Sequence, residues 1–250
     1  MKTYVINMEK DTIKKENILS QLRTIPQLDF EIIKACEGKK LSEEELRDLG
    51  YYKFQERYRE FGTLPAFGCS VSHFRIYEKI AKEDPVALVL EDDVIIANNF
   101  IDKLNSIRDF IASMNDEPTI ILLSPHFYYN KKDVFPTENN DVKITKVQGG
   151  YMASGYIINK AGAQLLEKRL YPIQYIADDW KEFIKMGLKL YGVLPHFTSF
   201  SDGLGEIGKS QLQKKESFIN KIKHCLGRTK GKLKFQFHYL NGLRFSKKIW

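Results

Sequence analysis

The 250-residue sequence lacks any apolar run long enough to cross a membrane. A transmembrane helix needs a stretch of at least about 18 apolar residues, and no segment of the chain approaches that length. The first ten residues also lack the apolar centre of a secretory signal peptide, because the charged pair Glu9 and Lys10 follows only a short apolar stretch. From the sequence we therefore expect a protein that stays in the cytoplasm.

Cysteine is scarce, with three residues at Cys36, Cys69 and Cys225. The number is odd and the spacing is not that of common zinc sites. Disulfide bonds are also rare in proteins of the reducing cytoplasm. We therefore interpret the cysteines as small, reduced apolar side chains and not as disulfides or zinc ligands.

Acidic residues are nearly absent from the end of the chain. Residues 209–250 contain twelve Lys or Arg and a single acid, Glu216, which gives this segment a net charge of +11. The remaining 27 bases and 31 acids give the rest of the chain a charge of −4, although the whole carries +7. The charge pattern predicts a mildly acidic domain over residues 1–208 and a basic tail over 209–250.

The tail interleaves aromatic residues with its bases, as in the segment that contains Phe235, Phe237 and Tyr239. Such segments suit an anionic membrane surface, where each nearby Lys or Arg contributes about 1 kcal/mol. Nucleic-acid binding would use the same charges, and a solvated tail without a partner is the simplest alternative. We favour the membrane surface.

The body alternates strand-like and helix-like patterns, which predicts a layered α/β domain. Strand-like runs lie at residues 3–7, 29–35, 85–90, 119–124 and 142–147. Helical spacing predicts helices at 12–22, 69–82 and 159–170, the last with Asn159 as its cap. Ser42 with Glu45 has the pattern of a capping box, and Asn98 or Asn99 would cap a further helix. Residues 126–141 are polar and rich in turn residues. In open α/β sheets, ligands bind beyond the carboxyl ends of the strands.

One of these carboxyl ends carries three consecutive acids, Glu91, Asp92 and Asp93, within the segment VALVLEDDVII. Carboxylates next to a buried strand are costly without a partner, and a nearby cation would relieve their mutual repulsion. In an extended chain Glu91 and Asp93 point to the same side, and Asp92 to the other. Their hard oxygen ligands suit Mg²⁺ or Mn²⁺ together with a substrate diphosphate. The alternative is a helix cap or a solvated loop.

Further candidate binding residues lie at predicted element ends. Asn7 ends the first strand, where its amide is placed to read a base or ribose, although a turn would use it as well. Gly68 and Ser70 lie at a predicted helix start, where free N–H groups favour phosphate. His73 follows in the first turn, and we slightly prefer a structural histidine there. Gly149 and Gly150 would let the backbone approach a sugar or form a simple turn.

Four segments together resemble glycosyltransferase family 25, which includes bacterial lipooligosaccharide β-galactosyltransferases and collagen-modifying relatives. They are TYVINMEKDTIKKENILSQL near the start, GCSVSHFRIYEKI (68–80), LVLEDDVII (88–96) and ASGYIINKAGAQLL (153–166). The resemblance covers roughly residues 1–200. It implies a GT-A fold with a mixed central sheet, a UDP-sugar donor, a Mn²⁺ or Mg²⁺ cofactor held by the acids, and inversion at the anomeric carbon.

The resemblance also implies roles for particular residues. Glu91 and Asp93 would hold the metal and Glu91 and Asp92 the nucleotide sugar. Independently of the resemblance, His196 is a candidate third metal ligand, although a lone histidine is more often structural. The base that deprotonates the acceptor would come from the segment YIADDW, as Asp178 or Asp179. Both acids also fit a cap for a helix that begins near Trp180.

The leading hypothesis is an inverting, metal-dependent galactosyltransferase that uses UDP-galactose. Its acceptor would be a lipid-linked lipooligosaccharide core, met on the cytoplasmic face of the inner membrane. A nucleotidyltransferase would use similar acids, but it usually has a glycine-rich phosphate loop, and residues 7–15 contain no glycine. The third hypothesis is a membrane-bound or nucleic-acid-binding protein with a non-catalytic α/β scaffold.

Overall fold

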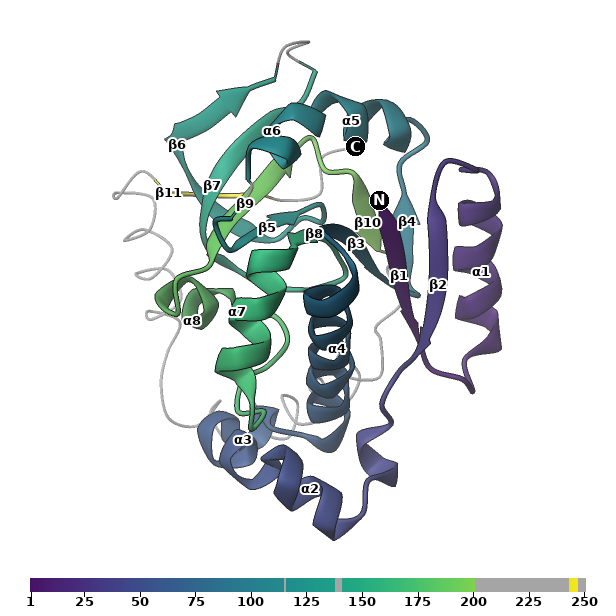
Figure 1. Ribbon diagram of the computed structural model, residues 1–250, viewed down its shortest axis with the longest axis vertical. Coiled ribbons are helices and arrows are strands. Elements are labelled where there is room, and N and C mark those ends of the chain that lie inside the picture. Colours follow the sequence, from purple (N-terminus) through teal and green to yellow (C-terminus); the bar gives the residue numbers. More distant parts are fainter. Residues whose placement is uncertain (115, 138–140, 201–242, 247–250) are drawn as a thin grey trace, which may run out of the picture.

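The computed structural model describes residues 1–114, 116–137, 141–200 and 243–246 (Figure 1). In these residues a nine-stranded sheet runs in the order β11-β6-β7-β9-β5-β8-β3-β1-β2, beside a two-stranded sheet of β10 and β4. The strands are β1 (Lys2–Asn7), β2 (Asp29–Lys34), β3 (Val86–Glu91), β4 (Val94–Ile96), β5 (Thr119–Leu122), β6 (Phe127–Pro136), β7 (Lys143–Gly150), β8 (Gly155–Asn159), β9 (Lys189–Leu194), β10 (Thr198–Phe200) and β11 (Leu243–Phe245). Parallel pairs join β1 to β2 and β3, whereas β8 runs antiparallel to β3 and β5.

Helices cover both faces of the main sheet (Figure 1). They are α1 (Thr12–Arg23), α2 (Glu43–Leu49), α3 (Tyr51–Tyr58), α4 (Leu64–Glu83), α5 (Phe100–Ser106), α6 (Arg108–Ser113), α7 (Lys160–Leu170) and α8 (Trp180–Lys185). One apolar core lies between the sheet and helices α3, α4, α7 and α8. A second core lies on the opposite face, under α1, α5 and the residue Ile107. The arrangement is a three-layer α/β domain.

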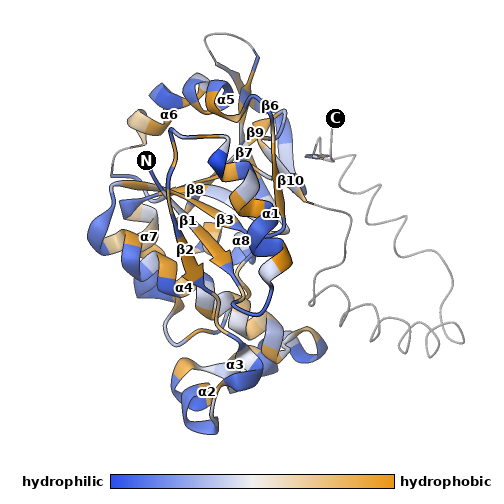
Figure 2. Cartoon of the chain, turned by 90° about the vertical axis from the view of Figure 1, so that its right-hand side faces the viewer, coloured by the Kyte–Doolittle hydropathy of each residue, from blue (hydrophilic) through white to orange (hydrophobic). Residues whose placement is uncertain are grey.

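The central strand β3 is buried on both faces, as its unbroken apolar sequence predicts. Ala87 and Val89 belong to the core under α4, and Leu88 and Leu90 to the core under α1. All four side chains are fully buried. Figure 2 shows the same pattern, with apolar strands in the middle and hydrophilic residues along the outer helices. The doubly covered strand therefore brings the acids that follow it to the edge of the core.

Two predicted helix caps are confirmed. Ser42 and Glu45 form a complete capping box at the start of α2, because each side chain bonds the other residue's backbone N–H. Asn159 caps α7, where its side-chain oxygen accepts from Gly162 N at 2.8 Å. In both places the cap residue predicted from the sequence sets the first residue of the helix.

The predicted start of α4 at residue 69 is wrong, because the helix begins at Leu64. Thr63 caps it by accepting from Ala66 N at 3.3 Å, and a proline lies in the first turn, where its missing N–H is not needed. Gly68 and Ser70 therefore lie inside the helix and have no free N–H groups for a phosphate. The first turn contains adjacent buried residues, among them Ala66 and Phe67. The helical spacing of apolar residues is therefore not visible in this part of the sequence.

Two other segments differ from the sequence interpretation. Most of the polar stretch 126–141 forms β6, which pairs antiparallel with β7 and has a register shift between Tyr129 and Val134. Its side chains are mainly half-buried or exposed, so the apolar alternation of an ordinary strand is weak. The single helix expected after Asn99 is two short helices, α5 and α6, which meet at Ile107.

Residues 243–246 are the described part of the predicted basic tail. Leu243–Phe245 form β11, which pairs antiparallel with Tyr128, Tyr129 and Asn130 of β6. The rest of 209–250 lies outside the described residues, so the division into domain and tail remains a prediction. Within the described ranges, no helix has both the length and the apolar character required to cross a membrane.

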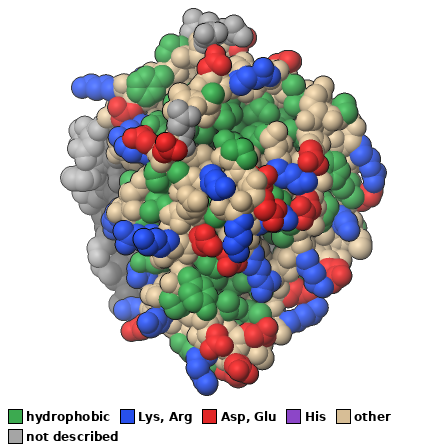
Figure 3. All heavy atoms as spheres, in the orientation of Figure 1, with side chains coloured by type: hydrophobic (Ala, Val, Ile, Leu, Met, Phe, Trp, Pro, Cys, Tyr) green, Lys and Arg blue, Asp and Glu red, His purple; other side chains and the backbone are tan. Residues whose placement is uncertain are grey.

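The face covered by α4 and α7 carries basic and acidic side chains in a mixed distribution (Figure 3). Neither sign forms a large continuous area among the described residues on this side. The mixed charge agrees with a body that has a nearly balanced number of acids and bases.

The interior position of Gly68 generates a stability prediction. An added Cβ would lie 2.4 Å from Cys36 O and 2.6 Å from Gly38 N, so backbone atoms would have to move. At an exposed helix position Gly→Ala would stabilise by about 1 kcal/mol. We expect Gly68→Ala to destabilise by about 1 to 3 kcal/mol in urea unfolding.

The matched control is Ser20→Ala on the exposed side of α1, which should change the free energy of unfolding by less than about 0.5 kcal/mol. An increase in stability of Gly68→Ala would show that α4 does not pack this closely on the loop at residues 36–38.

Candidate functional site

The acidic triplet lies where three strands meet. Glu91 is the last residue of β3 and pairs in register with Ile6 of β1, next to the strand end at Asn7. The N–H of Glu91 donates to Ser154 O at 2.8 Å, immediately before β8 begins. The carboxyl ends of β1 and β3 thus converge at the site, as predicted for ligand binding in an α/β sheet.

Asp92 is held by Asn7. The Asn7 side-chain nitrogen Nδ2 donates to Asp92 Oδ2 at 2.7 Å and to Asp11 O at 3.2 Å. Both Asn7 and Asp92 are buried. Asn7 therefore orients an acid of the triplet, and its predicted contact with a base or ribose remains a prediction.

Lys14 is the cation that faces this part of the triplet. Its Nζ lies 3.4 Å from Asp93 Oδ2 and 3.6 Å from Asp92 Oδ1. Burial lowers the pKa of Lys14, but the charges of Asp93, Asp92 and Asp11 outweigh burial and raise it overall. Lys14 therefore stays protonated and partly neutralises the two aspartates.

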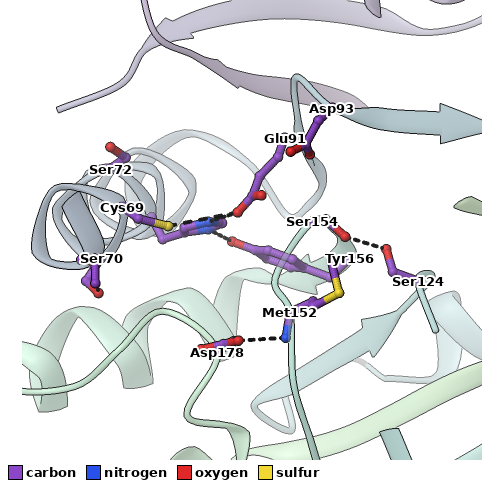
Figure 4. Close-up of polar contacts among 12 residues, drawn as sticks. Cys69, Ser70, Ser72, Glu91, Asp93, Ser124, Met152, Ser154, Tyr156 and Asp178 are labelled. Carbon is purple, nitrogen blue, oxygen red and sulfur yellow. Dashed lines mark hydrogen bonds and ion pairs between the residues drawn. The ribbon is translucent and has the colours of Figure 1, made fainter. Parts of the chain in front are cut away.

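Glu91 points toward helix α4 (Figure 4). Its Oε1 lies 3.1 Å from His73 Nε2 and 3.9 Å from Cys69 Sγ. The other ring nitrogen of His73, Nδ1, lies 2.8 Å from the Tyr156 hydroxyl. The charge of Glu91 is the largest of the charges that raise the pKa of Asp93, which agrees with carboxyl groups that lie close together. The expectation that the two side chains point the same way stays a prediction.

The acids keep more negative charge than Lys14 alone offsets. Burial, together with the charge of Glu91, raises the pKa of Asp93 from 3.8 to about 6. Burial also raises the pKa of Asp92. A nearby cation would stabilise the ionised form of such a buried carboxyl. Carboxylate oxygens are also the ligands that Mg²⁺ and Mn²⁺ prefer. The side chains at Asp92 and Asp93 therefore fit a divalent ion.

Asp178 faces the same region from the loop before α8 (Figure 4). Its Oδ2 accepts from Met152 N at 2.6 Å, while Trp180 Nε1 donates to Met152 O at 3.1 Å. Met152 has a positive φ of 74°, a backbone conformation that costs energy outside glycine. Burial raises the pKa of Asp178, and the charge of Glu91 raises it further, although the bond from Met152 acts against both.

Asp179 is placed differently from its neighbour. Its Oδ2 accepts a hydrogen bond from the Tyr58 hydroxyl of α3. It also occupies the N-cap position of α8, although its side chain makes no capping bond there. The structure thus separates the two candidate bases, because Asp178 accepts from the backbone of Met152 and Asp179 accepts from Tyr58 of α3.

The structure places His196 away from the triplet. Ala97 N donates to the neighbouring Phe197 O at 3.0 Å, and Val94, the residue after Asp93, pairs with Phe200. The two chain segments run antiparallel, so His196 lies at the opposite end of this pair of strands from Asp93. Its ring packs on Phe127 at 5.6 Å, and burial lowers the pKa of His196 to about 4.

The remaining predicted ligands have structural contacts. His73 is fully buried, and the hydroxyl of Ser70 donates to Ala66 O at 3.0 Å. A Cβ at Gly150 would lie 2.8 Å from His126 O, so this glycine allows β6 and β7 to approach. Gly149 has a φ of 147°. A role for these residues in binding the nucleotide sugar remains a prediction.

The sequence interpretation missed Cys69, Tyr58 and Tyr156 as parts of the site. Cys69 and His73 are four residues apart on α4 and therefore share one face of the helix. This signal was present in the sequence, but it becomes informative only when β3 is known to place Glu91 opposite that face. Both described cysteines, Cys36 and Cys69, are free thiols.

The protein has an α/β fold with a mixed sheet. Its acidic side chains cluster at the carboxyl ends of the strands, where ligands bind in folds of this class. The sequence profile of the family described as "Glycosyltransferase family 25 (LPS biosynthesis protein)" matches residues 1–180. The match covers well over half of the chain, and the chain belongs to glycosyltransferase family 25. The expected α/β fold class with a mixed central sheet is confirmed, and its GT-A type remains a prediction.

Several curated relatives show the same affiliation. A "Glycosyltransferase 25 family member" of Aedes aegypti is 29% identical over 177 residues, which are 66% of this chain and 28% of that protein. Human "Procollagen galactosyltransferase 2" is 24% identical over 65% of this chain and 26% of its own length. A bovine relative, 24% identical over 65% of this chain and 28% of its own length, is named "Probable inactive glycosyltransferase 25 family member 3". The chain thus spans about a quarter of the length of these proteins.

Similarity to solved structures is weaker. A galactosyltransferase, LgtC, crystallised with donor and acceptor sugar analogues, shares 10% identity with a TM-score of 0.40. That alignment covers 94% of this chain and 100% of the other.

The raised pKa of Asp93 predicts how the stability of the metal-free protein depends on pH. The folded state binds the proton of Asp93 more tightly than the unfolded state, so its contribution is complete below pH 3.8 and is lost as the pH rises through 6. Asp93→Asn should therefore gain stability relative to the unmodified protein over this range, by up to about 3 kcal/mol.

Urea unfolding in EDTA between pH 4 and 8 would measure this difference. The control is Asp29→Asn, which removes an exposed ion pair with Lys2 at the amino ends of β1 and β2. Its stability relative to the unmodified protein should show no comparable dependence on pH. A stability difference between Asp93→Asn and the unmodified protein that is constant with pH would contradict the burial of Asp93.

Proposed function

We propose that the chain is an inverting, metal-dependent glycosyltransferase that uses a UDP-sugar donor. The observation that supports this most is the cluster of three carboxyl groups, those of Glu91, Asp92 and Asp93, at the ends of β1 and β3, with Asp178 near enough for the charge of Glu91 to raise its pKa. Family membership supports the reaction class. One relative is named as probably inactive, so membership of the family does not by itself establish activity. The proposal of activity therefore depends on the acids present in this chain.

The donor diphosphate would lie beside Asp93. A bound Mn²⁺ or Mg²⁺ supplies positive charge that stabilises the departing diphosphate. Asp93 is its main candidate ligand, with Asp92 beside it, because Glu91 faces Cys69 and His73. Lys14 orients Asp92 and Asp93 and adds a second positive charge to the same region.

The acceptor hydroxyl must lose a proton as it attacks the anomeric carbon. Inversion requires the base to lie across the sugar from the diphosphate, and Asp178 comes from a different segment than the triplet. Its raised pKa makes it a better proton acceptor than an ordinary aspartate. Asp179 is the weaker candidate, because its carboxylate accepts from Tyr58.

Galactose is the proposed donor sugar, a choice supported by the name of the human relative. The description of the family as an LPS biosynthesis protein supports an acceptor in lipopolysaccharide or lipooligosaccharide synthesis. Such an acceptor is lipid-linked, and the basic residues of 209–250 would hold the protein on the anionic cytoplasmic face of the inner membrane.

Activity measurements on three variants test the proposed roles. We expect Mn²⁺-dependent release of UDP from UDP-galactose by the unmodified protein, lowered at least about 100-fold in Asp93→Asn, because the diphosphate loses its charge partner. Asp178→Asn should lower transfer by about 100-fold or more, since the base is lost, and Asp179→Asn by less than about tenfold.

Asp29→Asn serves as the surface control and should keep full activity. If calorimetry in the presence of Mn²⁺ detects no binding of any UDP-sugar, the proposal fails. In that case the non-catalytic alternative, a scaffold that carries a basic membrane-binding or nucleic-acid-binding tail, becomes the better explanation.

The membrane role of the tail has its own test. Replacing Lys221, Lys223, Lys230 and Lys232 by Gln leaves β11 intact and should weaken flotation with anionic liposomes by roughly 100-fold or more, at about 1 kcal/mol for each lysine. The matched control replaces four exposed lysines of the body by Gln, namely Lys39, Lys53, Lys131 and Lys132. Equal losses in the two variants would reject a specific role for the tail.

A further inference from the structure

Cys69, His73 and Glu91 form a cluster of three different metal-ligating side chains. Their ligand atoms all lie within 4.8 Å of one another, and they are the only such group among the described residues. Two of them come from one face of α4, and the third from the end of β3. We propose that this cluster binds a single Zn²⁺ ion, at a position separate from the divalent ion beside Asp93.

The two separations from Glu91 are close to those around tetrahedral zinc. Bonds of about 2.3 Å to sulfur and about 2.0 to 2.2 Å to nitrogen and oxygen set N–O and S–O separations of about 3.3 and about 3.6 Å. The observed separations from Glu91 Oε1 are 3.1 Å to His73 Nε2 and 3.9 Å to Cys69 Sγ. Shifts of a few tenths of an ångström would bring these two separations to the ideal values, and all three ligand atoms lie within 4.8 Å of one another. Three protein ligands leave the fourth position of the ion for water or another ligand.

The surroundings of His73 suit a metal ligand. Without an ion, a proton on Nε2 joins His73 to Glu91. When Zn²⁺ takes that place, the ring proton moves to Nδ1, where the Tyr156 hydroxyl at 2.8 Å accepts it. Tyr156 in turn donates to the Tyr77 hydroxyl at 3.4 Å. A histidine ligand whose second nitrogen donates to a fixed partner is oriented for the ion.

The ligand types select zinc over manganese or magnesium. A thiolate with an imidazole favours borderline-soft ions, whereas Mg²⁺ and Mn²⁺ prefer sets made of oxygen. Burial and the neighbouring acids raise the pKa of the Cys69 thiol, so the free cysteine is protonated. Binding of Zn²⁺ therefore releases this proton to solvent and replaces it with the ion.

Cobalt substitution tests the proposal on the full chain after dialysis against EDTA. Co²⁺ should add a thiolate-to-metal charge-transfer band in the near ultraviolet, and one equivalent of Zn²⁺ should remove it. In Cys69→Ser the band should disappear, and in Glu91→Gln the affinity for Co²⁺ should fall at least about tenfold. Cys36→Ser, which changes the other described free cysteine, should keep the band.

Asp93→Asn separates this site from the proposed catalytic metal, because it should keep the band while losing Mn²⁺-dependent activity. Peptide mapping after alkylation gives a second measurement, in which Zn²⁺ should protect Cys69 and leave Cys36 reactive. A cobalt spectrum without the charge-transfer band, or a band of equal strength in Cys69→Ser, would overturn the proposal. Either result is independent of transferase activity.

Discussion

The repulsion between carboxyl groups brought together at the end of a buried strand is the constraint around which the site is built. β3 is covered on both faces, so the acids that follow it cannot all turn to bulk water. The protein divides them instead. Asp92 turns to Asn7, Asp93 to Lys14, and Glu91 to His73 and Cys69. Each acid obtains a different polar partner, and the remaining unbalanced charge at Asp93 leaves a place where a cation is favourable.

Helix α4 links this charge distribution to the rest of the fold. Its early turns pack on the loop at residues 36–38 through Gly68, and the next turn presents Cys69 and His73 to Glu91. The hydroxyl of Ser72 accepts from Cys36 N at 2.8 Å and fixes the same contact. The position of the helix, the direction of Glu91 and the position of β3 are therefore set together.

Much of the fold was predictable because it depends on local patterns. The apolar run of β3 predicts a strand that is buried in the core, and the caps Ser42 and Asn159 predict where two helices begin. Each of these signals lies within the element itself. The polar strand β6 was not predictable, since it lies near the edge of the sheet and has little apolar alternation. The start of α4 was missed because its first turn is apolar on several sides.

The location of the acidic site was also predictable from the sequence, but the direction of each acid was not. The helix face that meets Glu91 depends on how α4 packs on the sheet, and an extended-chain argument cannot place that helix. The separation of Asp178 from Asp179 depends on Met152 and Tyr58, which are distant in sequence. Contacts of this kind arise from tertiary packing and leave no periodic trace in the chain.

The pairing of β11 with β6 has a consequence for the order of events during synthesis. Residues 128–130 of β6 pair with residues 243–245 of β11, which are synthesised more than a hundred residues later. This edge of β6 therefore stays unpaired until the ribosome has released residue 245. An unpaired strand edge can pair with the edge of another nascent chain. The half-buried, lysine-containing sequence of β6 reduces that hazard, because charged side chains on an edge strand oppose pairing with a second copy.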